Sequence, residues 1–551
     1  MKKRIMLGLA LLVSATIQSW ACTNFIVGKA ASKDGSVIVS YSADSYGMFG
    51  ELYHYPAAVH AKGAMRDIHE WDTGKFLGQI KEAQQTYNVI GNMNEFQVTI
   101  GETTFGGREE LVDTTGIMDY GSLIYVALQR SRTAKEAIKV MTDLVKEYGY
   151  YSSGESFSVA DPNEAWILEM IGKGPGVKGA VWVAVRVPDD CIAAHANQAR
   201  IHQFPLDDKE NCLYSPDVIS FAREKGYFDG LNKDFSFANA YCPIDFGGLR
   251  ACESRVWSFF NMFNKEAGAK YLPYIEAKTT EPMPLYIKPD NKISVRDIQW
   301  AMRDHYEGTA LDITNDVGAT AFKMPYRLSP LTFEVDGQKY FNERPISTQQ
   351  SAFTFVAQMR ADMPNEVGGV LWFGTDDANM MVFTPVYCCT NRLPKCYSSE
   401  IADCVTFSWE SAFWIYNWVA DMIRPRYSIM IDDMRGVQNK LEDTYADAQA
   451  GIESAAIALH AKDPKKAVEF LTNYTEMTAQ CAVDSWKKLG EYIIVKYNDG
   501  VVKKVNEDGS FVRPKYEEGA NAPLVRPGYP KEFLEEIVKA TGDRYKVYEV
   551  K

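Results

Sequence analysis

The chain has 551 residues, of which 46% are hydrophobic and 24% charged, a composition typical of globular proteins. With 59 Lys and Arg against 72 Asp and Glu, the formal net charge is −13. An acidic chain without a basic block disfavours nucleic acids and anionic membrane surfaces as partners. The length is enough for one large core with an extension, or for two or three modest domains.

The first 21 residues have the three parts of a secretory signal peptide. Residues 2–4 are basic, Ile5–Ile17 is an apolar run too short for a membrane span, and Ser19 and Ala21 are small. We therefore expect cleavage between Ala21 and Cys22, and export to the periplasm or the medium. No later segment is typical of a transmembrane helix, so we expect no membrane attachment once the signal is removed.

From Cys22 onward the pattern is typical of β-strands. Two apolar runs, Thr23–Gly28 and Val37–Tyr41, flank Lys33-Asp34-Gly35, which predicts a hairpin. A second turn is expected at Asp161–Glu164. Further strands are expected at Val98–Gly101, Ser156–Ala160, Ala165–Met170, Ala180–Val185 and Ile192–His195.

Helices are expected between and after these strands. Thr133–Tyr148 begins with a capping-box motif, Thr133 to Glu136, and ends before Gly149. Other helices are expected at Leu123–Arg130, Trp409–Ile423, Asp432–Leu459, Pro464–Leu489 and Lys531–Thr541. Strands grouped around paired helices predict a layered α+β architecture. We expect a signal peptide at 1–21, a catalytic domain at 22–399 and a mainly helical extension at 400–551.

The ten cysteines leave at least one thiol unpaired if Cys22 is set aside. Export permits disulfides, although a sequence does not assign their connectivity. Cys388, Cys389, Cys396 and Cys404 lie close together in sequence and are the best disulfide candidates. A zinc site is the weaker prediction there, because no CxxC pair and no nearby His supports it.

Cleavage before Cys22 would create a residue with its own base. The new α-amine, with a pKa of about 7.7–8.0, can take the proton of a thiol with a pKa of about 8.5. Nucleophile and general base then belong to one residue, and no separate His, metal or organic cofactor is required. Two alternatives are lipid attachment at Cys22 and an ordinary structural cysteine; Ser19 and Trp20 fit a lipidation signal poorly.

The residues after Cys22 favour catalysis. Cys22–Ser36 resembles the start of the cysteine-type N-terminal-nucleophile dipeptidases, the family of bacterial dipeptidase A and secernin. Penicillin V acylase and bile salt hydrolase are more distant relatives. The resemblance continues, in family order and as far as about Tyr397, through Gly91–Val98, Gly101–Thr103, Ala165–Glu169, Ala194–Ile201, Cys252–Trp257, Asp304–Thr309 and Arg344–Ser347.

The resemblance implies a four-layer αββα fold with Cys22 at the end of a central strand. It also implies that Asp44 holds the α-amine, that Asn197 helps form the oxyanion hole, and that Arg255 lies near the nucleophile and lowers its pKa. Each has a structural alternative. Asp44 could cap a turn, Asn197 could bind backbone groups at a strand end, and Arg255 could pair with Glu253.

The chain departs from the family at one position. Relatives commonly have Arg-Asn-Glu-Asp where this chain has Tyr41-Ser42-Ala43-Asp44. The Asp is retained, but Tyr41 replaces an Arg that lies beside the nucleophile in relatives. Either Arg255 activates the thiol alone, or the hydroxyl of Tyr41 contributes.

Other polar residues near these motifs have no assigned role. His195 and His202 are expected to be packing or rim residues, because no third ligand stands at metal spacing. Glu95 and Glu102 are either anchors for a substrate amine or structural. His305 and Tyr306 lie in a family motif without an assigned catalytic role.

These predictions combine into one hypothesis: an exported cysteine dipeptidase that acts on small peptides through a thioester on Cys22. A homo-oligomer is compatible with the sequence. The alternatives are an acyl-amide hydrolase of the penicillin V acylase and bile salt hydrolase type, and a non-catalytic surface lipoprotein.

Overall fold

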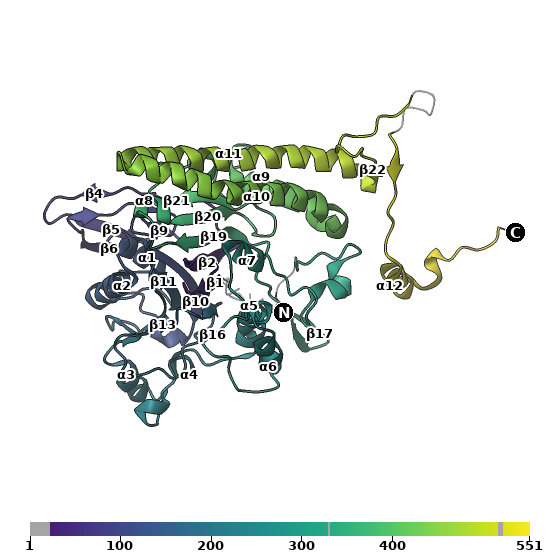
Figure 1. The fold of residues 1–551 in the computed structure, drawn as a ribbon. Coiled ribbons are helices and arrows are strands. Elements are labelled where there is room, and N and C mark those ends of the chain that lie inside the picture. Colours follow the sequence, from purple (N-terminus) through teal and green to yellow (C-terminus); the bar gives the residue numbers. More distant parts are fainter. Residues whose placement is uncertain (1–21, 329–330, 516–521, 551) are drawn as a thin grey trace, which may run out of the picture.

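The computed structural model of the protein describes residues 22–328, 331–515 and 522–550. Its centre is a pair of antiparallel β-sheets stacked face to face, with helices outside each sheet (Figure 1). The predicted signal peptide, residues 1–21, lies outside the described residues and stays a prediction.

The first sheet has seven strands and carries the start of the described chain. The predicted hairpin forms its centre, and Gly35 in the turn has a φ of 78°, which glycine adopts without strain. In spatial order its strands are β16 (Tyr286–Ile287), β14 (Ile192–His195), β1 (Thr23–Val27), β2 (Val37–Asp44), β19 (Ser351–Met359), β20 (Val370–Thr375) and β21 (Thr384–Tyr387).

The second sheet has eight strands and packs against β1 and β2 through β10 and β11. Asp161 forms the predicted turn, because its carboxylate accepts from the backbone N–H groups of Asn163 and Glu164. In spatial order the strands are β15 (Cys212–Tyr214), β13 (Ala180–Val187), β12 (Ala165–Gly172), β11 (Gly154–Ala160), β10 (Thr99–Gly106), β9 (Met93–Asn94), β8 (Val89–Ile90) and β3 (His54–Tyr55).

Two helices cover the outer face of the second sheet, α1 (Tyr120–Leu128) and α2 (Ala134–Tyr148). The side chain of Thr133 caps α2 by accepting from the N–H of Glu136, as the motif predicts. The Glu136 carboxylate accepts from the N–H of Arg132, so the second half of the capping box is displaced by one residue.

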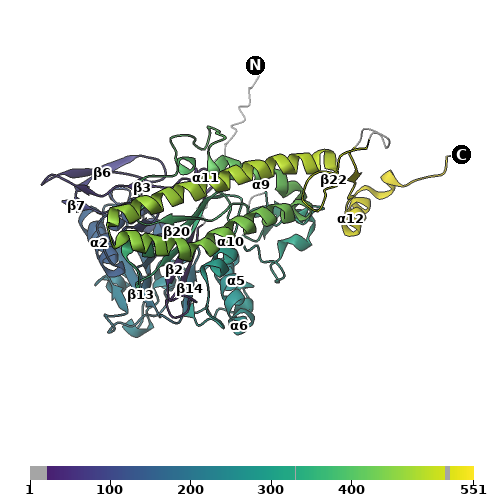
Figure 2. The same ribbon diagram turned by 45° about the horizontal axis from the view of Figure 1, so that its top comes forward.

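Helices also cover the outer face of the first sheet: α5 (Ser254–Phe263), α9 (Ala412–Ile423), α10 (Tyr427–His460) and α11 (Pro464–Tyr497). The ring of Phe25 on β1 stacks on that of Phe259 on α5, with centroids 4.0 Å apart. Helices α10 and α11 form a long antiparallel pair across this face (Figure 2). Helices from beyond residue 399 therefore share a core with the strands, and the predicted domain boundary there stays a prediction.

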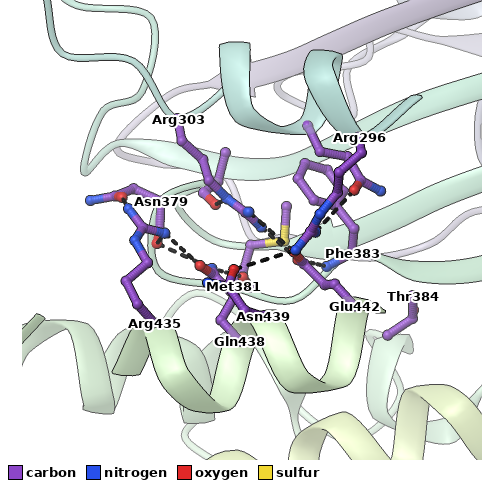
Figure 3. A network of polar contacts seen from close by, with 12 residues as sticks. Arg296, Arg303, Asn379, Met381, Phe383, Thr384, Arg435, Gln438, Asn439 and Glu442 are labelled. Carbon is purple, nitrogen blue, oxygen red and sulfur yellow. Dashed lines mark hydrogen bonds and ion pairs between the residues drawn. The ribbon is translucent and has the colours of Figure 1, made fainter. Parts of the chain in front are cut away.

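A buried ion pair joins α10 to the body of the protein (Figure 3). Arg303 donates to both carboxylate oxygens of Glu442, at 3.1 and 2.5 Å, and Arg296 binds the same carboxylate. The backbone N–H of Phe383 donates to it at 2.9 Å. Although burial raises the pKa of Glu442, the two guanidinium groups hold it below its usual value.

The remaining elements lie at the periphery. Helix α12, at the end of the chain, lies away from both sheets in both views (Figures 1 and 2). The other helices are α3 (Val218–Glu224), α4 (Phe237–Tyr241), α6 (Lys265–Ile275), α7 (Val295–Ala301), α8 (Asn365–Gly368) and α12 (Lys531–Thr541). Four two-stranded ribbons pair β4 (Ala58–Val59) with β7 (Gln85–Thr86), β5 (Met65–His69) with β6 (Phe76–Lys81), β17 (Thr332–Val335) with β18 (Gln338–Phe341), and β22 (Val502–Lys503) with β23 (Leu524–Val525).

The predicted α+β class is confirmed, while the disulfide expectation is not met. All ten cysteines are free thiols. Cys388 and Cys389 have their sulfurs 3.8 Å apart, and Cys396 is buried whereas Cys404 is exposed, so these last two thiols lie in different surroundings. Within the described ranges, no helix is both long and apolar enough to span a bilayer.

Candidate active site

Cys22 lies directly before β1, and its side chain is buried. Its Sγ is 3.4 Å from Oε1 of Glu102 and 3.8 Å from the hydroxyl oxygen of Tyr41. The backbone N–H of Asp44 also donates to the sulfur. Groups from β2 and β10 therefore meet at the thiol where β1 begins.

The pairing of β1 with β2 explains this arrangement. Asn24 lies opposite Tyr41, and directly opposite residues share one face of a sheet. Cys22 is two residues before Asn24, so its side chain lies on that face as well. The face is turned toward β10, where Asn24 Nδ2 donates to the carbonyl oxygen of Glu102 at 2.6 Å.

Gly101 allows the two sheets to approach each other at this point. A Cβ at position 101 would lie 2.3 Å from Oδ1 of Asn24 and 3.2 Å from Cβ of Tyr41. The first distance is far inside van der Waals contact, so only glycine permits β10 to lie this close to β1. The carboxyl group of the next residue, Glu102, then reaches the sulfur.

The surroundings favour the protonated thiol. Burial, and then the nearby carboxylates of Glu102 and Asp44, raise the pKa of Cys22 well above its usual value. In the chain described here Cys22 is still joined to Ala21 by a peptide bond. A free ammonium group at this position would act in the opposite direction, because a nearby positive charge favours the thiolate.

Asp44, predicted to hold the α-amine, lies at the end of β2 and is buried. Arg344 donates to its Oδ2 at 2.6 Å, and the hydroxyl of Ser351 donates to its Oδ1 at 2.6 Å. The negative charge of Asp44 is one of the causes of the raised thiol pKa of Cys22. This carboxylate is therefore fixed by an ion pair beside the start of β1.

Arg255 follows a π-helical turn, Gly248–Glu253, at the first turn of α5. Such turns are frequent at functional sites. Its Nη1 donates to the carbonyl oxygen of Cys22 at 2.7 Å, and its Nη2 to Oδ1 of Asn197 at 2.8 Å. The alternative partner, Glu253, pairs with Arg200 at 2.8 Å.

Asn197 has a φ of 61°, in the left-handed region that Asn tolerates better than most residues. Its Nδ2 donates to the carbonyl oxygen of Thr104 on β10 at 2.7 Å, which is the backbone contact that its structural alternative predicts. The same amide accepts from Arg255, so the side chain is held on both sides. The three predicted residues Asp44, Asn197 and Arg255 thus surround the start of β1.

The histidines near the motifs pack within the fold. His195 lies between the sheets, with Nδ1 2.7 Å from the hydroxyl of Thr103 and Nε2 2.8 Å from that of Ser158. Burial, reinforced by Arg200, lowers the pKa of His195 to about 3. This neutral ring fits the expected packing role.

The other unassigned residues hold local structure. His202 Nδ1 lies 3.1 Å from the hydroxyl of Ser236, and the carboxylate of Glu95 accepts from the N–H of Asn88 at 3.0 Å. Tyr306 donates to the carbonyl oxygen of Arg344 at 2.7 Å, next to the residue that binds Asp44. His305 Nδ1 lies 3.1 Å from Glu307.

Sequence reasoning did not assign two residues of this site. Arg344 stands in a quoted motif, Arg344–Ser347, and that motif was the available signal. Glu155 on β11 lies opposite Thr104 and contacts Glu102. Nothing in the local sequence around Glu155 distinguishes it from an ordinary strand residue facing solvent.

The model of a known protein family matches this chain. The model of peptidase family C69 matches residues 21–54 and 49–440, which together span most of the chain. The chain belongs to peptidase family C69. The family resemblance inferred from the motifs is therefore confirmed, and the C69 match also extends past the predicted boundary at residue 399 into α10.

Curated relatives of this C69 peptidase have related names. A protein of Salmonella dublin named probable dipeptidase is 28% identical over 389 residues, which is 67% of this chain and 81% of the relative. A probable dipeptidase of Latilactobacillus sakei is 24% identical over 496 residues, 85% of this chain and 96% of the relative. Dipeptidase A of Lactobacillus helveticus is 24% identical over 432 residues, 74% and 83% of the two chains.

Proposed function

We propose that this C69 peptidase is an exported cysteine dipeptidase, in the periplasm or the medium, whose nucleophile is Cys22 after cleavage behind Ala21. One observation carries the proposal: the guanidinium group of Arg255 binds both the carbonyl of Cys22 and the side chain of Asn197. A buried thiol beside a fixed amide donor is the arrangement that acyl transfer needs. The names of the relatives support peptides as substrates.

The fold family proposed is that of the four-layer αββα N-terminal-nucleophile hydrolases. Support comes from the two stacked antiparallel sheets, the helices on both outer faces, and the position of Cys22 beside the central strands β1 and β2. In such a fold the new N-terminus lies inside the site rather than on the surface.

In the first half of the reaction, the α-amine of Cys22 takes the thiol proton and the sulfur attacks the peptide carbonyl carbon. Asn197, together with backbone N–H groups, stabilises the negative charge on the carbonyl oxygen. The carbon–nitrogen bond then breaks, the ammonium returns its proton to the leaving amine, and an acyl thioester remains on Cys22.

In the second half, the same amine takes a proton from water while the water oxygen attacks the thioester carbon. The carbon–sulfur bond breaks, and the sulfur recovers a proton from the ammonium. The carboxylic acid product leaves, and both Cys22 groups return to their starting state. No other proton carrier enters the cycle.

Asp44 is proposed to orient the α-amine and to stabilise its protonated form during turnover. Its ion pair with Arg344 and its hydrogen bond from Ser351 fix the carboxylate for this role. Arg255 is proposed to act by position, because it donates hydrogen bonds to the carbonyl oxygen of Cys22 and to Asn197 rather than to the sulfur.

The test is substitution of the nucleophile in the processed protein. Cys22→Ala and Cys22→Ser are expected to abolish dipeptide hydrolysis, measured by amine release, while Cys404→Ala, at an exposed cysteine, keeps full activity. Chelator-sensitive activity that survives in Cys22→Ala would contradict the mechanism.

Intact mass spectrometry of the mature N-terminus tests the processing. A free, unmodified Cys22 is expected. A lipid on the thiol or an acyl group on the amine would contradict the proposal, because these modifications consume the nucleophile and the base. A substrate panel then separates dipeptides from N-acyl amino acids, which an acylase-type enzyme would prefer.

A further inference from the structure

Two buried carboxyl groups face each other beside the nucleophile. Glu155 lies opposite Thr104 in the β10–β11 pair, and Glu102 is two residues from Thr104, so both acids lie on the same face of the sheet. The Tyr41 hydroxyl donates to Oε1 of Glu102 at 2.6 Å, and the Thr104 hydroxyl donates to Oε1 of Glu155 at 2.7 Å. The two carboxyl groups are in hydrogen-bonding range of each other.

Within the part of the chain that the structure describes, neither acid forms an ion pair with a Lys, Arg or His. Among the described residues, no other group donates a hydrogen bond to the buried Oε2 atom of either Glu102 or Glu155. Burial raises the pKa of both acids, and the charge of Glu102 raises the pKa of Glu155 further. Tyr41 brings a neutral hydroxyl to Glu102. Buried acids normally have a cation or several donors, so these two carboxyl groups favour the approach of a positive group.

A cavity of about 270 Å³ reaches one member of this pair, Glu155. Glu155 and Thr104 form part of its wall, and further acids, Asp72 among them, line the rest. Burial raises the pKa of Asp72 to about 7, with Glu102 among the other causes. The described lining residues include no Lys or Arg; they are Glu70, Asp72, Thr104, Val112, Thr114, Asp119, Tyr120, Tyr151, Ser152, Ser153 and Glu155.

The geometry of a peptide matches this position. In an amino acid, the α-nitrogen is two bonds from its own carbonyl carbon, a separation of roughly 2.5 Å from standard bond lengths and angles. When the sulfur of Cys22 attacks that carbon, the α-ammonium must lie within a few ångströms of the sulfur. Oε1 of Glu102 is 3.4 Å from Sγ, which places an anion where the ammonium arrives.

We propose that Glu102 and Glu155 bind the free α-ammonium group of the substrate's first residue. The proposal rests on the proposed function, because it places the attacked carbonyl at Cys22. The substrate class is then peptides with an unblocked N-terminus, cleaved at the first peptide bond. N-acyl amino acids are excluded, since they would leave two buried carboxyl groups without a cation.

The experiment compares three substrates that differ at the amine: Ala-Ala, N-acetyl-Ala-Ala and propionyl-Ala, which is Ala-Ala without its amino group. The wild-type protein is expected to hydrolyse Ala-Ala roughly 10- to 100-fold more efficiently than either neutral analogue, as charge-assisted hydrogen bonds allow. Equal efficiency on all three would overturn the inference, while loss of activity in Cys22→Ala would still support the proposed nucleophile.

Glu155→Gln tests the residue itself. We expect kcat/KM for Ala-Ala to fall roughly 10-fold or more, mainly through KM, while propionyl-Ala hydrolysis does not fall. An equal fall for both substrates would indicate a structural role and overturn the inference. Glu109→Gln, at an exposed acid three residues before Val112 of the wall but not itself part of the wall, is the matched control and keeps the wild-type preference.

Two further measurements decide the question if Glu155→Gln does not fold or if no peptide is hydrolysed. Asp72→Asn, on the exposed part of the wall, is expected to lower kcat/KM for Ala-Ala but not for propionyl-Ala. Titration calorimetry with Cys22→Ala is expected to show tighter binding of Ala-Ala than of propionyl-Ala. Equal binding, or no binding of Ala-Ala, would overturn the inference whatever the state of the proposed function.

Discussion

The hydroxyl of Tyr41 lies 2.6 Å from Oε1 of Glu102, and both groups are buried next to the sulfur of Cys22. The hydroxyl donates to the carboxylate and also lies 3.8 Å from the sulfur. The Tyr41 hydroxyl therefore stabilises the buried Glu102 carboxylate with a neutral donor.

Tyr41→Phe is expected to lower kcat/KM on Ala-Ala by about 10-fold, because a buried acceptor left without its donor costs about 1–3 kcal/mol. Steady-state kinetics and thermal unfolding measure the two effects. Tyr445→Phe removes a buried hydroxyl that donates to Thr478 between α10 and α11. This control should lose stability and keep activity; equal activity losses in both variants would contradict a role at the site.

Arg255→Lys is expected to lower kcat by about 100-fold or more with a smaller change in KM. A single ammonium does not reproduce the guanidinium fork that binds Cys22 and Asn197 together, and small misplacements of reacting groups are costly. The matched control is Arg360→Lys, which disrupts a buried bidentate pair between the residue after β19 and Glu453 on α10. It should destabilise the protein without a comparable loss of kcat.

Asn197→Gly and Asn197→Ala separate catalysis from backbone strain. Both remove the amide donor, so kcat should fall about 100- to 1,000-fold in each. Of the two replacements, only Ala is strained at a φ of 61°, so Asn197→Ala should be less stable than Asn197→Gly by about 1 kcal/mol. Steady-state kinetics and urea unfolding are measured for both variants. A loss of kcat that is larger in the less stable variant would argue against the oxyanion role.

His195 predicts a pH dependence of stability. Its folded-state pKa of about 3 lies below the usual value of about 6.5, so its contribution is present above pH 6.5 and is lost as the pH falls toward 3. Between pH 7 and pH 5, the wild type should lose about 2 kcal/mol more than His195→Gln, which does not titrate. Urea unfolding at both pH values measures this difference; equal losses would contradict the shift.

Glu442→Gln tests the ion pair that joins α10 to the body of the protein (Figure 3). Arg303 would lose its anion while Arg296 would keep only Asp443, and breaking a buried pair costs about 3–5 kcal/mol. Glu476→Gln, on α11, breaks a partly exposed pair with Arg392 and should cost at most about 1 kcal/mol. Similar losses in the two variants would contradict the proposed anchoring.

Local signals predicted much of the fold. The Asp34-Gly35 turn gave the β1–β2 hairpin, and Ile192–His195 and Lys531–Thr541 were predicted with the observed bounds. Helix α11 was predicted to end at Leu489 but continues to Tyr497, because Gly490 is not a stop. A Cβ at Gly490 would lie 2.2 Å from the ring of Trp418, so this glycine is needed for packing.

The site was predicted through family resemblance more than through local pattern. Asp44, Asn197 and Arg255 are far apart in sequence, and no periodicity brings them to Cys22; the stacked sheets do. Glu155 was missed because alternation along a strand does not tell which face is buried when helices cover the outer side. The disulfide expectation failed because closeness in sequence does not fix the direction of side chains: Cys396 points into the core and Cys404 to solvent.

The separation of the two sheets at the site depends on an atom that Gly101 lacks. A single added methyl group would meet the side chain of Asn24 and push β10 outward, and the Glu102 carboxyl group would move away from the sulfur with it. The lack of a side chain at position 101 therefore determines how closely the two sheets approach each other. Gly101 sets the gap in which thiol, hydroxyl and carboxyl meet, although it supplies no chemical group of its own.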